Sequence, residues 1–365
     1  MNQQRHFSVE LLRQQTMIIL TGWGMPENIA QETAELMLET DLLGIDSHGI
    51  SMLPHYDKLR QEGKWHPDAQ VTVVSQTPVT AVLDGGHALG HATAMTAMKL
   101  AIAKSENTGI GAVVVRNSNH FGAAGLYARY AAARGKIALV TSTTRSRMLV
   151  PSRAKFPVLG TNPIAFAAPS GEKEDFVLDM ATTTVAANKV KVYEFNGSDL
   201  PAGWVVNEEG AQVTDSSQGM DYVYRRKEGG LTPLGGLEQS GGHKGYGLAM
   251  MAQILAGPLA GAAFAPTREA GGMPNIGHFF LALDPAAFGD PDVFKAELDT
   301  IINTLHATPS ADPQSPVLVA GEPENQRHRQ RQRDGIPVSD ALLAQLHALC
   351  EREHFVDLLS PVTRT

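Results

Sequence analysis

The sequence predicts an α/β protein: a central mixed-sheet α/β domain plus a discontinuous helical domain contributed by both termini. Apolar residues recur at helical spacing near both ends, whereas strand-like and helical segments alternate in the middle. Because each element must bury its apolar face, the terminal helices are expected to pair into one layer. We therefore predict a helical domain over 1–75 plus 290–365 and an α/β domain over 76–289.

The individual elements follow from apolar periodicity and from helix-ending residues. The helix expected at 27–43 begins after Pro26 and ends at Gly44, a residue type that commonly follows a helix. The other expected elements are a helix at 8–20, strand-like residues at 72–86, a helix at 92–106, a strand at 109–117, a helix at 122–134, strands at 136–143, 162–169 and 176–182, a helix at 243–257, a strand at 277–284, and helices at 291–306 and 338–353, with a charged segment at 322–334.

Composition argues against several classes of protein. A formal net charge of −8 disfavours nucleic acid or an anionic membrane as the main partner. Cys350 is the only cysteine, so one chain can form neither a disulfide nor a thiolate metal site. The first residues lack the layout of a signal peptide, and no apolar run reaches about 18 residues. We expect a cytoplasmic protein.

Several common site motifs are absent. No G-x-G-x-x-G follows a strand, and neither a P-loop nor an H-E-x-x-H sequence occurs. Ser47 has no glycine two positions before it, so it does not belong to a nucleophile elbow. The chemistry must therefore come from less familiar stretches.

The stretch "DSHG" (46–49) places a histidine directly after a predicted helix, on a connecting segment of the kind that often holds functional side chains. A neutral imidazole near pH 7 both donates and accepts protons, as a carbonyl–alcohol interconversion requires. The alternative is that His48 only caps the helix C-terminus.

Two glycine-rich turns introduce helices and could bind anions through backbone N–H groups. The first is Gly122 to Gly125, preceded by His120; the second is 240–250, where Lys244 adds positive charge. Both turns are equally compatible with a purely structural role.

Polar residues at strand ends supply further candidates. Thr161 and Asn162 precede a predicted strand and could donate hydrogen bonds. Asp179 ends an apolar strand, where it could orient an imidazole or cap a neighbouring segment. His87 and His91 have the spacing of some metal-binding pairs, but no obvious third ligand accompanies them, and we predict no metal site.

Five stretches in this order resemble the type-2 malate/L-lactate dehydrogenase family: "GIDSHGISMLPHY", "NSNHFGAAGLY", "GTNPIAFAAP", "DMATT" and "GGHKGYGLAMMAQILAG". The resemblance runs from about residue 8 to 340 and is closest to the broad-range hydroxycarboxylate dehydrogenase subgroup. It implies a non-Rossmann fold, NAD or NADP as cofactor, a small 2-oxo or 2-hydroxy acid as substrate, and a homodimer.

The resemblance also implies roles for individual residues. His48, paired with Ser47, would exchange a proton with the substrate oxygen, and His120 is the rival base. Asp179 would lie on the substrate side together with Thr161 and Asn162. The residues expected to contact the cofactor are His48, His120, Gly122, Ala123, Ala124, Val177, Leu178, Asp179, Met180, Ala181, His243, Lys244, Gly321, Glu322, Pro323 and Glu324.

Two positions depart from the family pattern. Many members have an arginine where this chain has Met52, and a glycine where it has Arg153. An arginine suits a bidentate grip on a substrate carboxylate. We therefore expect Arg153, or else Arg145 or Arg147, to supply the missing cation.

These residues favour hydride transfer at C2 of a 2-hydroxy or 2-oxo acid. Three alternatives remain open: a reductase of cyclic imine carboxylates, a metal-dependent hydrolase suggested by the thirteen histidines, and a non-catalytic nucleotide-binding protein.

Overall fold

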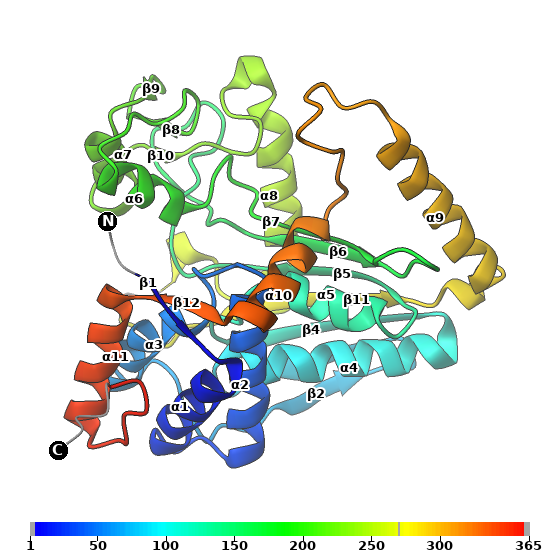
Figure 1. The fold of residues 1–365 in the computed structure, drawn as a ribbon, viewed down its shortest axis with the longest axis horizontal. Helices are drawn as coiled ribbons and strands as arrows, with labels where there is room; N and C mark the ends of the chain where they lie inside the picture. Colours follow the sequence, from blue (N-terminus) through cyan, green and yellow to red (C-terminus); the bar gives the residue numbers. More distant parts are fainter. Residues whose placement is uncertain (1–3, 269–270, 361–365) are drawn as a thin grey trace.

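A computed structural model describes residues 4–268 and 271–360 (Figure 1). Its centre is a seven-stranded sheet in which only β3 and β4 run parallel; all other neighbours are antiparallel. This mixed sheet confirms the predicted fold class. In spatial order its strands are β2 (Thr72–Gln76), β3 (Thr80–Asp84), β4 (Ile110–Ser118), β11 (Ile276–Leu283), β5 (Ile137–Ser142), β6 (Ile164–Ala168) and β7 (Phe176–Met180).

Helices cover both faces of this sheet. Alternate residues of β4 point to opposite sides: Val113 and Val115 pack under α4 (Gly90–Thr108) and α5 (Gly125–Ala132). Val114 instead joins the apolar cluster on the other face, beneath the end of α8 (Gly242–Ala256). Since both faces are buried, the central strands contain nearly continuous apolar runs.

Helices from both ends of the chain share a second apolar core. Leu12 and Met37 pack with Leu346, and Tyr56 lies in the same cluster. A two-stranded sheet ties the ends together by pairing Phe7 with Ile336. The elements of this part are β1 (Gln4–Phe7), α1 (Val9–Gly22), α2 (Glu27–Leu42), α3 (Leu53–Gln61), β12 (Ile336–Ser339) and α11 (Asp340–Glu353).

Helix α9 (Pro291–Ala307) does not join these terminal helices, although we assigned it to their domain. It projects at the opposite end of the molecule from α1 and α11 (Figure 1). Asp299 of α9 accepts hydrogen bonds from the backbone N–H groups of Gly171 and Glu172, in the turn between β6 and β7. Its apolar side chains are largely exposed, and only Ile302 is buried. The packing therefore places α9 beside the α/β part.

Several elements have no counterpart in the sequence-based prediction. The charged segment is a helix, α10 (Glu322–Asp334), with acidic residues in its first turn and basic residues in its last, which suits the helix dipole. Residues between β7 and α8 form a small unit with its own core around Val190 and Leu231. Its elements are α6 (Ala187–Phe195), β8 (Val205–Val206), β9 (Gln212–Val213), α7 (Ser216–Tyr224) and β10 (Gly230–Leu231).

Four short 3₁₀ helices complete the described structure: η1 (Ile50–Met52), η2 (Glu238–Ser240), η3 (Ala265–Thr267) and η4 (Pro285–Ala287). None of the helices in the described residues has the length and apolar character needed to cross a membrane.

Candidate active site

One edge of the seven-stranded sheet gathers the loops that hold most of the candidate residues. Because β11 and β6 run opposite to β4, β5 and β7, the carboxyl ends of β4, β5 and β7 meet the amino ends of β6 and β11 at this edge. The loops brought together there are 119–124, 143–149, 160–163, 181–183 and 271–275.

His48 reaches this edge from the segment between α2 and η1. Ser47 Oγ lies 2.7 Å from His48 Nδ1, and this contact orients the imidazole. The ring stacks on that of His120, with centroids 5.4 Å apart and planes 30° apart. Burial lowers the pKa of His48, so the neutral ring is favoured near pH 7. His48 and His120, the two histidines predicted from the sequence as candidate proton-transfer residues, thus lie side by side in the structure.

His120 has a defined hydrogen-bonding arrangement. Its Nδ1 lies 2.6 Å from the hydroxyl of Tyr56 and accepts a hydrogen bond of 3.3 Å from the backbone N–H of Gly122. An N–H group can only donate, so Nδ1 is unprotonated and the neutral ring has its proton on Nε2. Burial, reinforced by the neighbouring histidines, holds the pKa of His120 well below its usual value. His120 therefore offers a hydrogen-bond donor at Nε2.

Asp41 lies beneath the turn that contains His48. Its carboxylate accepts a hydrogen bond of 2.9 Å from the backbone N–H of Ile50, and burial raises its pKa to about 8. A Cβ on Gly49 would lie 2.0 Å from Asp41 Oδ1, so only glycine fits over this side chain. Asp41 thus fixes the path of the backbone immediately after His48.

His91 is fully buried behind the same residues. Its ring meets that of Tyr56 edge-on at 5.8 Å, and neither ring nitrogen has a hydrogen-bond partner among the described residues. Burial, with a smaller contribution from His48, lowers its pKa to about 3. Gly122 has φ +76°, and a Cβ there would lie 3.0 Å from His91 Nε2, which explains the glycine.

Asp179 contacts a helix terminus rather than an imidazole. Its carboxylate accepts a hydrogen bond of 2.7 Å from the backbone N–H of Gly125, the first residue of α5. The sequence left open whether Asp179 orients an imidazole or caps a neighbouring segment, and the contact in the structure is a helix cap. The residue remains accessible to solvent, yet the surrounding protein partly desolvates the carboxylate and raises its pKa to about 6.

The candidate cofactor residues lie on several elements, of which α5 and α8 cover opposite faces of the sheet. In the described part of the chain, the backbone N–H groups of Ala123 and Ala124 have no acceptor, as suits a phosphate group before α5. Val177 of β7 donates its backbone N–H to Ala320 O at 3.1 Å, which places the start of α10 beside β7. His243 and Lys244 are exposed in the first turn of α8. This chemistry fits a dinucleotide with anionic phosphates.

The three candidate substrate residues have different environments. Asn162 is fully buried, and its amide nitrogen donates to Ala249 O and Gln253 Oε1 of α8, both at 3.1 Å. Thr161 precedes it and is half-buried. Arg153 is exposed and forms an ion pair with Glu238. The structure thus gives Asn162 and Arg153 partners within the protein.

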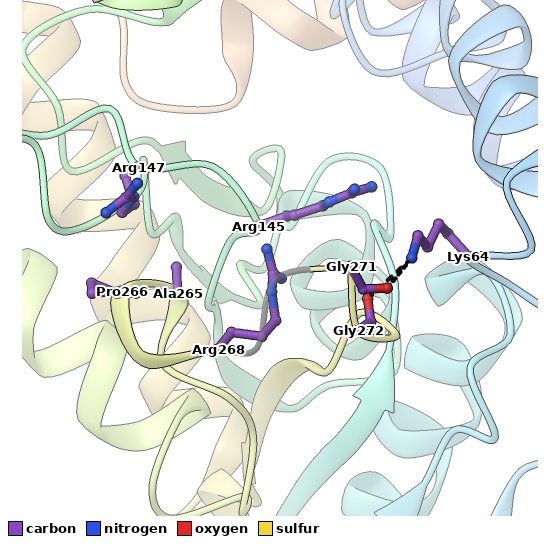
Figure 2. A pocket seen from close by; sticks show the side chains of 8 residues that line it. All are labelled: Lys64, Arg145, Arg147, Ala265, Pro266, Arg268, Gly271 and Gly272. Carbon is purple, nitrogen blue, oxygen red and sulfur yellow. Dashed lines mark hydrogen bonds between the residues drawn. The ribbon is translucent and has the colours of Figure 1, made fainter. Parts of the chain in front are cut away.

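Arg145 and Arg147 have a different setting from Arg153. They line a pocket of about 260 Å³ together with Lys64 and Arg268 (Figure 2). Met52, at the position where the family pattern has arginine, packs against the apolar core of the terminal helices.

Comparisons with known proteins decide the family. The model of the malate/L-lactate dehydrogenase family matches residues 7–347. The chain belongs to this family. The malate dehydrogenase of Pyrococcus horikoshii is 38% identical over 92% of this chain and 91% of its own. The L-sulfolactate dehydrogenase of Methanothermobacter thermautotrophicus is 36% identical over 90% of this chain and 91% of its own length. Hydroxycarboxylate dehydrogenase B of Escherichia coli is 29% identical over 93% and 91%.

Solved structures of two other proteins share this fold. The malate dehydrogenase of Entamoeba histolytica matches with a TM-score of 0.91 and 30% identity, covering 99% of this chain and all of its own. The Δ1-piperideine-2-carboxylate reductase of Pseudomonas syringae matches with a TM-score of 0.80 and 26% identity. The match covers 94% of this chain and 99% of the reductase chain. The protein is therefore an oxidoreductase of the malate/L-lactate dehydrogenase type.

Sequence reasoning missed three residues that pack around His48 and His120 in the structure. Tyr56 stood in the recognised motif "SHGISMLPHY" but received no role, although its place in that motif was a usable signal. Asp41 and His91 lie on long helices, where nothing in the local sequence shows that they face His48.

Proposed function

We propose that the protein interconverts a 2-hydroxy acid and the corresponding 2-oxo acid with NAD or NADP, and that His48 is its acid–base group. The main support is the position of His48: oriented by Ser47, stacked on His120, and placed at the sheet edge where the candidate cofactor loops meet. Catalysis of this type requires a positioned proton carrier beside the reacting carbon.

The residues of this chain handle the proton and the orientation of the substrate. In oxidation, neutral His48 accepts the proton of the substrate hydroxyl as C2 loses a hydride; in reduction, protonated His48 returns it to the oxygen. The Nε2–H of His120 donates a hydrogen bond to the same oxygen and steadies it. When bound, the nicotinamide cofactor accepts or supplies the hydride at C4.

The proposed cofactor contacts follow the loops around His48 and His120. The N–H groups before α5 and the positive charge of Lys244 suit the phosphates. Asp179 acts as a positioning residue because it holds the start of α5. The full proposed set is His48, His120, Gly122, Ala123, Ala124, Val177, Leu178, Asp179, Met180, Ala181, His243, Lys244, Gly321, Glu322, Pro323 and Glu324.

A second candidate reaction is reduction of a cyclic imine carboxylate. It is favoured by the structural match to a Δ1-piperideine-2-carboxylate reductase. A C=N bond accepts a hydride at carbon as C=O does, and His48 would then protonate nitrogen. A metal-dependent hydrolase has no comparable support, because no three or more His, Cys, Asp or Glu side chains within residues 4–268 and 271–360 are grouped to hold a metal ion.

The test is oxidation of NADH and NADPH with a panel of 2-oxo acids and cyclic imines, for the wild type and His48→Ala. We expect turnover of a 2-oxo acid by the wild type, and a loss of kcat of about 10²- to 10⁴-fold in the variant with little change in cofactor Kd. His66→Ala, at an exposed histidine, is the control. Equal losses in kcat and cofactor affinity would make His48 a binding residue. Cofactor binding without turnover of any panel member would favour a nucleotide-binding protein.

We also propose that the protein is a homodimer. Two exposed apolar strips lie outside the terminal-helix core: Met250, Ile254 and Leu259 on and after α8, and Val293, Ile301 and Leu305 on α9. Exposed apolar side chains grouped along a helix often mark a protein interface, and a second copy would present the same strips. Sedimentation equilibrium should give a dimer for the wild type and a monomer for Ile254→Glu/Ile301→Glu. An unchanged mass would reject this surface.

A further inference from the structure

Helix α10 joins two parts of the candidate active site. Its start lies beside β7, where the carbonyl of Ala320 accepts the backbone N–H of Val177 at 3.1 Å. Its later residues lie against α2, since His328 Nε2 is 3.2 Å from a carboxylate oxygen of Glu39 (Figure 1). The helix therefore extends from the proposed cofactor residues to the helix that leads into the turn of His48.

Arg331, in the last turn of α10, reaches the segment before His48. Its guanidinium forms a two-pronged ion pair with the carboxylate of Asp46: Nη2 lies 3.1 Å from Oδ2, and Nη1 contacts Oδ1. The same Nη1 donates to the backbone carbonyl of Asp41, near the end of α2. The Arg331 side chain is only 12% exposed, so water and salt screen this pair less than a fully exposed one. Arg331 thus ties the end of α2 to a residue two positions before His48.

The path of the backbone around His48 depends on where Asp46 lies. The backbone carbonyl of Asp46 accepts a hydrogen bond from the hydroxyl of Ser51, which closes the turn that contains His48. A second side chain of α10 packs against the same segment: the Arg327 side chain fills the space that a Cβ on Gly44 would occupy. Helix α10 therefore supports this turn from outside, at its beginning.

We propose that Arg331 is a positioning residue, which through Asp46 holds the turn of His48 in place relative to the cofactor residues at the start of the same helix. This inference rests on the proposed function and adds a residue to it. Guanidinium–carboxylate pairs with two parallel hydrogen bonds fix direction as well as distance. Proton transfer beside hydride transfer needs such a fixed geometry. The competing explanation is that the pair only stabilises the fold.

The first test measures kcat and cofactor Kd of Arg331→Gln with a 2-oxo acid that the wild type reduces. We expect kcat to fall about tenfold, because a displacement of about 1 Å costs up to 10²-fold, while cofactor Kd changes less than about threefold. Asp46→Ala should show the same pattern, and the double variant should be no worse than Arg331→Gln. Arg331→Lys should recover part of the loss, since it keeps the charge without the fork. Arg333→Gln, at an exposed arginine in the same turn of α10, is the control.

The pH dependence separates a positioning role from a purely structural one. Burial lowers the pKa of His48, and the neighbouring His91 and His120 are kept neutral by burial as well. A loosened turn admits water to the ring, so the midpoint of kcat/KM for oxidation should rise toward pH 6.5 in Arg331→Gln and stay in place in Arg333→Gln. A pair that only stabilised the fold would lower the melting temperature and leave kcat per folded molecule and this midpoint unchanged.

The other outcomes overturn the proposal. Wild-type kcat and midpoint in Arg331→Gln would do so, as would a higher cofactor Kd at unchanged kcat, which would confine α10 to cofactor binding. A wild type inactive on every acid and imine would refute the proposed function instead. The imidazole NMR signal of His48, assigned by its absence in His48→Ala, would then decide. A titration midpoint raised in Arg331→Gln but not in Arg333→Gln supports the positioning role, and identical titrations reject it.

Discussion

The hydroxyl of Tyr56 lies 2.6 Å from Nδ1 of His120. Tyr56 belongs to α3 and packs in the core of the terminal helices, whereas His120 stands at the end of β4. One hydrogen bond thus links the helical part to the edge of the sheet that holds the candidate active site. It also fixes which nitrogen of His120 faces the proposed substrate.

Replacing Tyr56 with phenylalanine should impair catalysis without unfolding the protein. The buried Nδ1 would keep only the weaker bond from Gly122, so the His120 ring would be less firmly oriented. We expect kcat to fall about tenfold, equivalent to one hydrogen bond, with cofactor Kd nearly unchanged. Tyr222→Phe, which removes a remote hydroxyl bonded to Glu208, is the matched control. Wild-type kcat in Tyr56→Phe would show that this bond does not orient a catalytic group.

The pH dependence should reflect the lowered pKa of His48. The neutral ring accepts the proton in oxidation, so kcat/KM for a 2-hydroxy acid should stay constant as pH falls to the ordinary histidine value of 6.5 and decline only below it. Reduction needs the protonated ring, so its kcat/KM should rise as pH falls. Rate measurements in both directions between about pH 5 and 9 check this. If kcat/KM for oxidation fell with a midpoint above pH 6.5, a group other than His48 would be the proton acceptor.

His91→Met should stabilise the protein more in acid than in alkali. Folded His91 has a pKa of about 3, against 6.5 when exposed, so below pH 6.5 the unfolded chain binds a proton that the native protein excludes. Stability is therefore lost as pH falls from 6.5 toward 3. At about 1.4 kcal/mol per pH unit, the gain in unfolding free energy should be about 2 kcal/mol larger at pH 5 than at pH 8.

Urea denaturation at the two pH values measures this difference. His66→Met, at an exposed histidine, should show no comparable dependence on pH. A gain of the same size at both pH values would mean that His91 is not held neutral by the fold.

Gly49→Ala should displace the turn that contains His48. The added Cβ would overlap the carboxylate of Asp41, which cannot withdraw without breaking its bond to Ile50. We expect kcat to fall by more than about tenfold, because misplacing a catalytic group by about 1 Å costs up to 10²-fold. Gly289→Ala, where a Cβ meets open space, is the control. The double variant Gly49→Ala/Asp41→Ala should recover part of the activity; if it is as impaired as Gly49→Ala, the steric explanation is wrong.

The sequence predicted the central strands well because their burial on both faces leaves a strong apolar signal. The strand expected at 277–284 is β11, Ile276–Leu283, and the one expected at 176–182 is β7, Phe176–Met180. Helix α10 escaped prediction because it has no buried side chain and therefore no apolar period. The strands between β7 and α8 have two residues each and are too short to show any period.

The candidate site could be predicted only where a motif marked it. Ser47, His48 and His120 were proposed from their sequence context, and the fold brings the two histidines together. Asn162 came from a motif too, but its amide group holds α8 in place, so its proposed contact with substrate needs an independent test. The basic pocket could not be read from the chain, since Lys64, Arg145 and Arg268 meet only after folding.

The pairing of Phe7 with Ile336 also constrains the order in which the enzyme is made. Strand β1 and helices α1–α3 leave the ribosome first, but the partners that cover them, β12 and α11, are synthesised only at the other end of the chain. Such long-range contacts form slowly, and the early helices expose apolar surface until they do. The apolar core that contains Tyr56 is therefore completed only when β12 and α11 have been synthesised.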